Sequence, residues 1–226
     1  MGGRGASFIP PSSNGKWSNG PMGPEGREAK TLKDALGKKG APHSLGDSVV
    51  ETNPNHSVDY REFSQNCQRC VVAYELRRRG YDVTALPTYQ GDKLPQIAYV
   101  DNKNNIYAAR WRGAFQNAKT VDVSARGNNP AAEQRVMDNI AAKMREYGNG
   151  ARAVVQILYR GGGGHVFNVE NQNGHITYVE AQVGKIKDMA ATMRHVKTDS
   201  VNLVRVDNLR VSERAKQFVR TSYRHR

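Results

Sequence analysis

The pattern of hydrophobic and polar positions divides the chain near residue 58. Residues 1–57 are rich in Gly, Pro, Ser, Asn and Lys and show hardly any apolar periodicity, whereas apolar positions beyond them recur at helical or strand spacing. A segment that cannot bury apolar surface stays unfolded, because nothing offsets the entropy lost when it is ordered. We therefore predict a flexible basic arm over residues 1–57 and one folded domain over residues 58–226.

Two helices stand out within the predicted domain. Residues 67–79 carry helix formers and apolar positions, and Gly80 follows as a stop signal. Asn129 and Pro130 combine a capping side chain with a proline at the first helical position, which predicts a second helix up to Gly148. The apolar stripe of this second helix is ordinary core and consists of Val136, Ile140 and Met144.

The remaining patterns predict strands. We expect strands at 81–86, 152–159 and 202–209, hairpins at 96–111 and 165–180, and a basic tail helix at 213–226. A helix followed by mostly antiparallel strands is typical of an α+β domain. The predicted fold is therefore a cysteine-bearing N-terminal helix packed on an antiparallel sheet.

The chain is strongly basic, with 34 Lys and Arg against 21 Asp and Glu, a net charge of +13 and a pI of about 9.9. This charge suits contact with nucleic acid, an acidic protein or an anionic surface, and a solvated basic surface explains it equally well. The candidate phosphate contacts are Arg77 to Arg79 and the terminal SYRHR, which a solvated helix end would also explain. We expect no membrane span and no signal peptide, since no apolar run approaches ~18 residues.

Both cysteines, Cys67 and Cys70, lie in the stretch SQNCQRCVVAYE at residues 64–75. Two cysteines do not make a disulfide framework. A zinc site needs four ligands, and this single CxxC has neither a second pair nor an H-x3-5-H spacing to complete it, so we expect no metal and no other cofactor. A redox pair, two structural thiols, and a nucleophile with a bystander remain open.

As a nucleophile, Cys67 would benefit from its place in the first turn of a helix. Unpaired N–H groups and the positive end of the helix dipole favour a thiolate there and offer donors to an oxyanion. The site also needs a histidine base that a third group orients. Of the six histidines, those at 43, 56 and 225 lie in the arm or the tail, and His165 stands out among the rest because four glycines precede it.

The predicted hairpin at 165–180 suggests the partner of His165. If Asn173-Gly174 forms a type I′ turn, paired positions sum to 347, so that His165 faces Gln182 and Glu180 is its diagonal neighbour. If the hairpin closes on Gln172-Asn173, the sum is 345 and His165 faces Glu180 directly. Both registers place the three side chains on one face of the sheet. The predicted catalytic set is therefore Cys67, His165 and Glu180.

At these residues the chain resembles the papain-fold toxin family of glutamine deamidases, which are bacterial effector domains of polymorphic toxins. The resemblance runs from about residue 64 to 184 and rests on three motifs in order: NCQRC with the later RGYDVTALP, then GHVFNV, then YVEAQVG. It implies a papain-like fold with Cys67 as nucleophile, His165 as base and Glu180 as acid. The chain departs from the family in carrying Glu where Asp is commoner.

The resemblance implies deamidation of a glutamine in a target protein through a thioester, although papain-like sites also cleave peptide bonds and the sequence does not separate the two. Candidate groups for the oxyanion or substrate are Gln65, Asn66, Gln182, Gly164 and the backbone N–H of Cys67. Cys70 is expected to be a packing residue, or else a partner of Cys67 in a reversible disulfide. The implied partners are a protein substrate and an immunity protein.

A different class of function also fits the sequence. The start MGGRGAS resembles the openings of phage minor head proteins, and the charge of +13 fits the same interpretation. This resemblance implies a virion protein that binds DNA or other virion proteins through its basic arm and tail, with or without the thiol activity. The localisation expected is therefore either an effector delivered to a target cell or a virion component.

Overall fold

The computed structural model describes residues 28–89 and 110–222. The helices are α1 (Leu32–Leu36), α2 (Leu45–Glu51), α3 (Arg61–Ser64), α4 (Cys67–Arg78), α5 (Pro130–Tyr147) and α6 (Met189–Met193), with the 3-10 helices η2 (Arg110–Ala114) and η3 (Glu213–Gln217). The strands are β1 (Val83–Ala85), β2 (Val121–Asp122), β3 (Arg152–Leu158), β4 (Gly164–Gln172), β5 (His175–Glu180), β6 (Lys185–Ile186), β7 (Asn202–Arg205) and β8 (Val219–Thr221). None of the helices in these residues combines the length and the apolar character that crossing a membrane requires.

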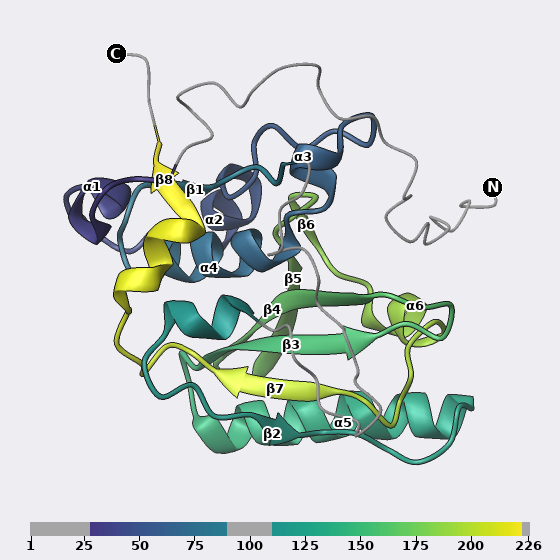
Figure 1. Ribbon diagram of the computed structural model, residues 1–226. Helices are drawn as coiled ribbons and strands as arrows, with labels where there is room; N and C mark the ends of the chain where they lie inside the picture. The colour runs from purple at the N-terminus through teal and green to yellow at the C-terminus, as the bar shows by residue number, and fades with distance from the viewer. Residues whose placement is uncertain (1–27, 90–109, 223–226) are drawn as a thin grey trace, which may run out of the picture.

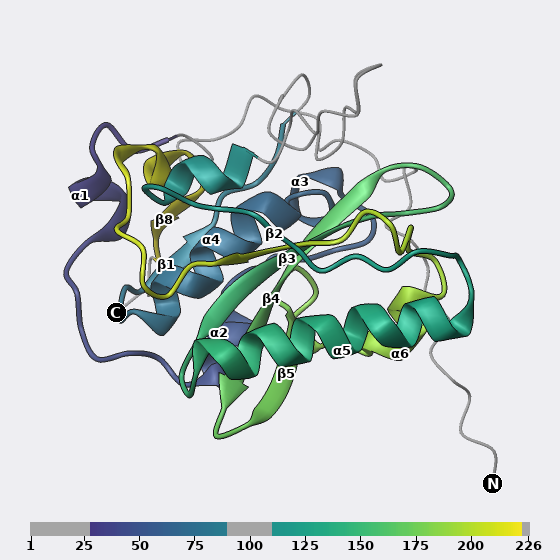
Figure 2. The same ribbon diagram turned by 90° about the horizontal axis from the view of Figure 1, so that it is seen from below.

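Six of the strands form one antiparallel sheet in the order β2-β7-β3-β4-β5-β6, and β1 pairs with β8 in a separate antiparallel ribbon. Helix α4 lies on one face of the large sheet and α5 on the other, as Figure 1 shows. Figure 2 shows α5 running across the strands from below. The predicted α+β class and the packing of the cysteine-bearing helix on an antiparallel sheet are confirmed.

The alternation of side chains along the strands explains the two layers. Successive residues of a strand point to opposite faces. On β4, Val166 joins the core beneath α4, while Phe167 and Val169 join the core beneath α5. The stripe predicted on α5 is buried in this second core and consists of Val136, Ile140 and Met144.

The β4–β5 hairpin adopts the first of the two predicted registers. Gln172 pairs with His175 and Asn168 with Val179, so paired positions sum to 347. The turn residues Asn173 and Gly174 have φ angles of 54° and 87°, as a type I′ turn requires. Glu180 at the end of β5 is therefore a diagonal neighbour of His165 on β4.

Helix α4 begins at Cys67 and continues to Arg78, as the pattern predicts. Gly80 ends it with a φ of 97°, and a Cβ at this position would lie 2.3 Å from the carbonyl oxygen of Gly40. Only glycine permits this approach. The strand predicted at 81–86 is shorter than expected and forms β1.

The prediction of a flexible arm is wrong for residues 32–51. Thr31 and Ser44 cap the short helices α1 and α2, which contribute Ala35, Leu36 and Val49 to the core beneath α4. Helices this short leave little periodicity in a sequence and owe their stability to packing. The rest of the predicted arm up to residue 27 lies outside the described residues.

Two predictions near the ends of the domain also need correction. The tail helix expected at 213–226 is instead the short η3 followed by β8, because Phe218 and Val219 bury their side chains where β8 pairs with β1. The strand expected at 202–209 ends at Arg205 and is not the last one. Of the hairpin expected at 96–111, residues 96–109 lie outside the described residues, and Arg110 begins a 3-10 helix.

Candidate active site

The thiol of Cys67 lies where the first turn of α4 meets strand β4. Its sulfur accepts hydrogen bonds from the backbone N–H groups of Val166, Gln68 and Cys67 itself. The residue is buried, with 7% of its surface exposed. The thiol therefore lies against the backbone of the residue that follows His165.

Burial decides the protonation state of this thiol. It raises the pKa of Cys67 to about 12, and the nearby charge of Glu180 adds to the rise. The three N–H groups act in the opposite direction but do not outweigh the loss of solvation. The expectation that the helix N-terminus yields a thiolate is therefore wrong for the resting site, in which the thiol is neutral.

His165 and Glu180 are in direct contact, as the hairpin geometry predicts. The Nε2 atom of His165 lies 2.6 Å from Oε2 of Glu180, and both side chains are buried. The imidazole also stacks on the ring of Tyr159, with centroids 6.5 Å apart, and lies 6.0 Å from the ring centroid of Phe167. Because Glu180 occupies Nε2, the ring nitrogen left to act toward a thiol is Nδ1.

The structure brings Cys67 close to this pair without joining the thiol to the imidazole. Among the described residues, the hydrogen bonds of Sγ go to backbone N–H groups, and none reaches the ring of His165. Burial raises the pKa of both Cys67 and Tyr159, and the charge of Glu180 adds to the rise in each. Thiol, carboxylate and phenol thus share one poorly solvated region at the start of β4.

Sequence reasoning missed Lys187, the second partner of Glu180. Its Nζ lies 2.5 Å from the same Oε2 that contacts His165. Burial alone would raise the pKa of Glu180, but His165 and then Lys187 lower it to about 2. The motif YVEAQVG ends before Lys187, so the only signal in the sequence is a lysine shortly after a strand.

Asn66, predicted to lie near the oxyanion or the substrate, makes its hydrogen bonds within the protein. Its Nδ2 donates to Oδ1 of Asn53 at 3.0 Å and to the carbonyl of Leu86 at 3.2 Å, so both amide hydrogens are engaged. Asn53 in turn donates to the carbonyl of Gln182 at 2.7 Å. This buried pair of amides ties the start of α4 to the turn after β5 and is not available to a substrate.

The other candidate groups around the oxyanion stay predictions. Gln65 is half-buried and directly precedes Asn66, while the half-buried Gly164 opens β4. Gln182 is buried in the turn after β5. The backbone N–H groups of Cys67 and Gln68 already point at the sulfur, so they are the donors best placed for an oxyanion that forms on a carbon bonded to it.

Cys70 lies one turn further along α4 and is 1% exposed. Its Sγ donates to Oδ1 of Asn66 at 3.3 Å, and both cysteines are free thiols. In the part of the chain that the structure describes, no three His, Cys, Asp or Glu side chains gather as metal ligands would.

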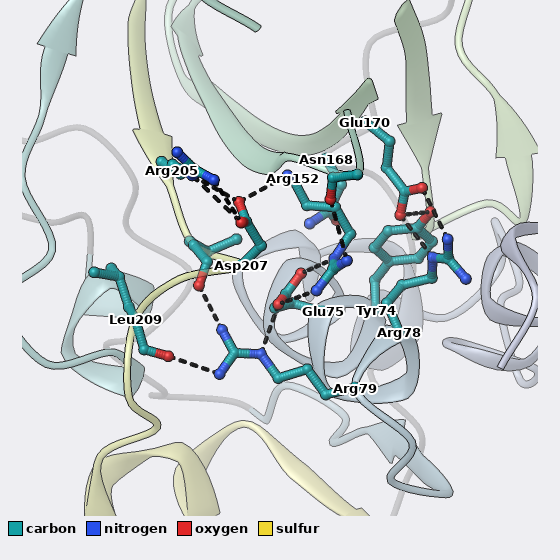
Figure 3. A network of polar contacts seen from close by, with 12 residues as sticks. Tyr74, Glu75, Arg78, Arg79, Arg152, Asn168, Glu170, Arg205, Asp207 and Leu209 are labelled. Carbon is teal, nitrogen blue, oxygen red and sulfur yellow. Dashed lines mark hydrogen bonds and ion pairs between the residues drawn. The ribbon is translucent and has the colours of Figure 1, made fainter. Parts of the chain in front are cut away.

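The run Arg77 to Arg79 is neither a phosphate-binding patch nor a solvated helix end. Arg77 is 1% exposed and bonds to Asp82 and the carbonyl of Val83. Arg78 pairs with Glu170 and Arg79 with Glu75, as Figure 3 shows. Three arginines at the end of a helix look like surface residues in the sequence because several of their partners, Glu170 for Arg78 and the carbonyls of Val206 and Leu209 for Arg79, are distant along the chain. Of the terminal SYRHR, only Ser222 lies within the described residues.

Comparison with known proteins gives one match. The chain matches the family described as papain fold toxin 1, glutamine deamidase, over residues 65–185. No curated protein and no solved structure matches it. The matched segment covers more than half of the 226 residues and contains Cys67, His165 and Glu180. The chain therefore belongs to the papain fold toxin 1 family of glutamine deamidases.

Proposed function

We propose that this protein deamidates a glutamine side chain of a target protein, with Cys67 as nucleophile, His165 as base and acid, and Glu180 as the group that orients the imidazole. The observation that carries the proposal is the 2.6 Å contact between His165 and Glu180, one residue from the strand position that holds the Cys67 thiol. The family match supports a cysteine-dependent deamidase.

The first step forms a thioester. Because the resting thiol is neutral, its proton passes to Nδ1 of His165 as Sγ attacks the carbon of the substrate carboxamide. The backbone N–H groups that hold Sγ then lie next to the developing oxyanion. His165 returns the proton to the nitrogen, the carbon–nitrogen bond breaks, and ammonia leaves.

The second step releases glutamate. His165 takes a proton from water, whose oxygen attacks the thioester carbon, and the carbon–sulfur bond breaks. The sulfur regains a proton from the imidazole. In sum, a carboxamide and a water molecule become a carboxylic acid and ammonia, and the enzyme is unchanged. Glu180 stays ionised throughout and stabilises the transient imidazolium.

The same three groups would also serve a cysteine peptidase, with an amine in place of ammonia as the leaving group. The family description favours the deamidase. It also favours a toxin that acts on a protein of another cell, for which an immunity protein covering the site is the partner we infer. The alternative of a DNA-binding virion protein gains no support from the match, and the arginines that suggested it on α4 are engaged internally.

The test is a mixture of bacterial proteins incubated with the enzyme and then analysed by mass spectrometry and for free ammonia. We expect new conversions of Gln to Glu that accompany ammonia release. They should disappear in Cys67→Ala and persist in Cys70→Ser, whose hydroxyl still donates to Asn66. New chain ends that depend on Cys67, without ammonia, would instead identify a peptidase.

A second measurement does not depend on finding the target. The rate at which iodoacetamide alkylates Cys67 is followed in a Cys70→Ser background, with and without His165→Ala. Loss of the imidazole should slow labelling roughly tenfold or more, because a thiol with a raised pKa reacts only as fast as a base can take its proton. An alkylation rate that is the same with and without His165→Ala, together with an unchanged protein mixture, would overturn the proposal.

A further inference from the structure

Lys187 occupies an unusual place for a lysine. It follows β6, and its backbone N–H donates to the carbonyl of Tyr178 on β5 at 2.8 Å. Its side chain is 6% exposed, and Nζ lies 4.9 Å from the ring centroid of Phe167. A lysine is almost never buried unless it is paired. Here the backbone, an aromatic ring and a carboxylate fix the ammonium in one position.

The contact with Glu180 has a specific form. The ammonium and the imidazole approach the same carboxylate oxygen, Oε2, at 2.5 Å and 2.6 Å. Carboxylates accept several hydrogen bonds, and bonds to ionised groups are the short and strong ones. Two donors on one oxygen leave the carboxylate a single orientation, which is the one that holds His165.

We propose that Lys187 is a positioning residue of the active site, which keeps Glu180 ionised and aimed at Nε2 of His165, so that Nδ1 is the ring nitrogen left to act toward the thiol. This inference rests on the function proposed above. Lys187 lies beyond Lys185, where the segment matched by the family ends. It touches neither the thiol nor the groups expected to touch the substrate, so it acts through Glu180 alone.

The charges around Glu180 show why an ammonium is needed there. A buried carboxylate next to other groups that can become negative would otherwise take up a proton. The groups in electrostatic contact with Glu180 come from α4, the residue after β3, β4 and the segment after β6, and they are Cys67, Cys70, Tyr159, His165 and Lys187. Lys187 is the only one of these five with a permanent positive charge.

The test compares alkylation rates of Cys67 by iodoacetamide in a Cys70→Ser background. Lys187→Met keeps the length of the side chain and removes the charge, and we expect labelling to slow about tenfold, as for loss of a hydrogen bond to a charged group. Lys187→Arg keeps a charge within reach of Oε2 and should stay within about threefold of the parent. In a Glu180→Gln background, Lys187→Met should change nothing, because the group through which it acts is gone.

The titration of Glu180 gives an independent readout. Followed by the carboxyl carbon shift in glutamate-labelled protein, it should move to higher pH in Lys187→Met than in the parent or in Lys187→Arg. Lys187→Gln, which keeps a donor for Oε2, replaces Lys187→Met if the latter does not unfold cooperatively. This titration reports whether Lys187 keeps Glu180 ionised, and the labelling rates report whether that ionised carboxylate matters to the thiol.

The outcomes separate this proposal from the proposed function. A labelling rate that is the same with and without His165, together with an unchanged protein mixture, overturns both. Labelling that depends on His165 but is the same in the parent and Lys187→Met overturns only the role of Lys187. A rate that Lys187→Met lowers equally with Glu180 present and in the Glu180→Gln background also overturns it, because Lys187 then acts through the fold and not through the carboxylate.

Discussion

Buried carboxylates lie near both ends of α4 where the helix packs on the large sheet, yet the partners of these carboxylates differ. At the C-terminal end, Glu75 of the helix and Glu170 of β4 are paired with arginines, as Figure 3 shows. At the N-terminal end, Glu180 of β5 is paired with a histidine and a lysine. An arginine keeps its charge at any pH that proteins meet, while a histidine exchanges a proton near neutrality.

The ion pairs at the C-terminal end of α4 involve arginines, which stay charged. Glu75 accepts from Arg79 at 2.6 Å and from Arg152 at 2.7 Å, and its side chain is fully buried. Glu170 accepts two bonds from Arg78 and one from the hydroxyl of Tyr74. Paired carboxylates of this kind lock the helix to β3 and β4. Strand β4 thus carries Glu170, which together with Glu75 and their arginines forms a clamp on α4, and also His165, the base of the proposed site. The clamp sets the position of the helix that presents the thiol.

The largest effect on stability is expected from Glu75→Ala. It leaves two largely buried guanidinium groups without their carboxylate, and breaking a buried ion pair in this way costs about 3–5 kcal/mol of unfolding free energy. Denaturant unfolding measures the change. The matched control is Glu146→Ala, whose pair with Lys143 is exposed and should contribute far less. Equal losses of unfolding free energy in the two variants would show that the buried ion pairs of Glu75 stabilise the fold no more than an exposed pair.

The sequence predicts those parts of the site whose geometry is set by residues close together in the chain. The turn Asn173-Gly174 sets the register of its hairpin, and strand alternation then places His165 and Glu180 on one face. The helix start at Cys67 likewise follows from nearby residues. These features depend on residues close together in the chain, where spacing and turn type are enough.

The features that the sequence does not reveal depend on distant residues. Arg79 looks like a surface residue until the carbonyls of Val206 and Leu209, more than 100 positions away, are seen to accept its hydrogen bonds. Asn53 lies in a segment without periodicity, yet it holds Gln182 across 129 positions of the chain. The neutral state of Cys67 also escapes sequence reasoning, because burial, which no local pattern reports, outweighs the helix N-terminus.

The second prediction concerns how stability depends on pH near the N-terminal end of α4, where Glu180 lies. The pKa of Glu180 falls from an ordinary 4.5 to about 2 in the folded protein. Because the folded value is the lower one, its contribution to stability is complete above pH 4.5 and is lost as the pH falls toward 2. The shift corresponds to about 3 kcal/mol. Unfolding free energies of the parent and of Glu180→Gln should therefore converge over this pH range.

The control for this effect is a comparison at constant charge. Glu180→Gln with Lys187→Met removes both charges of the pair. As the pH falls below 4.5, the unfolding free energy of this double variant should decrease less steeply than that of the parent. If the parent and both variants lose stability in parallel below pH 4.5, the acid sensitivity comes from other carboxylates and Glu180 is not the distinctive group of its end of the helix.

The smallest effect is expected from Tyr74→Phe at the C-terminal end. The ring is fully buried and its hydroxyl donates to Oε1 of Glu170 at 2.8 Å. Burial and the neighbouring Glu170 raise the pKa of Tyr74, so the phenol stays neutral and donates its proton. Phe keeps the packing and removes one hydrogen bond to a carboxylate that Arg78 still pairs, which should cost about 1–2 kcal/mol. Denaturant unfolding should register this loss, while alkylation of Cys67 and ammonia release stay at the parent rate. A fall in thiol reactivity without a matching loss of stability would show that the two ends of α4 are coupled and that the clamp also tunes the site.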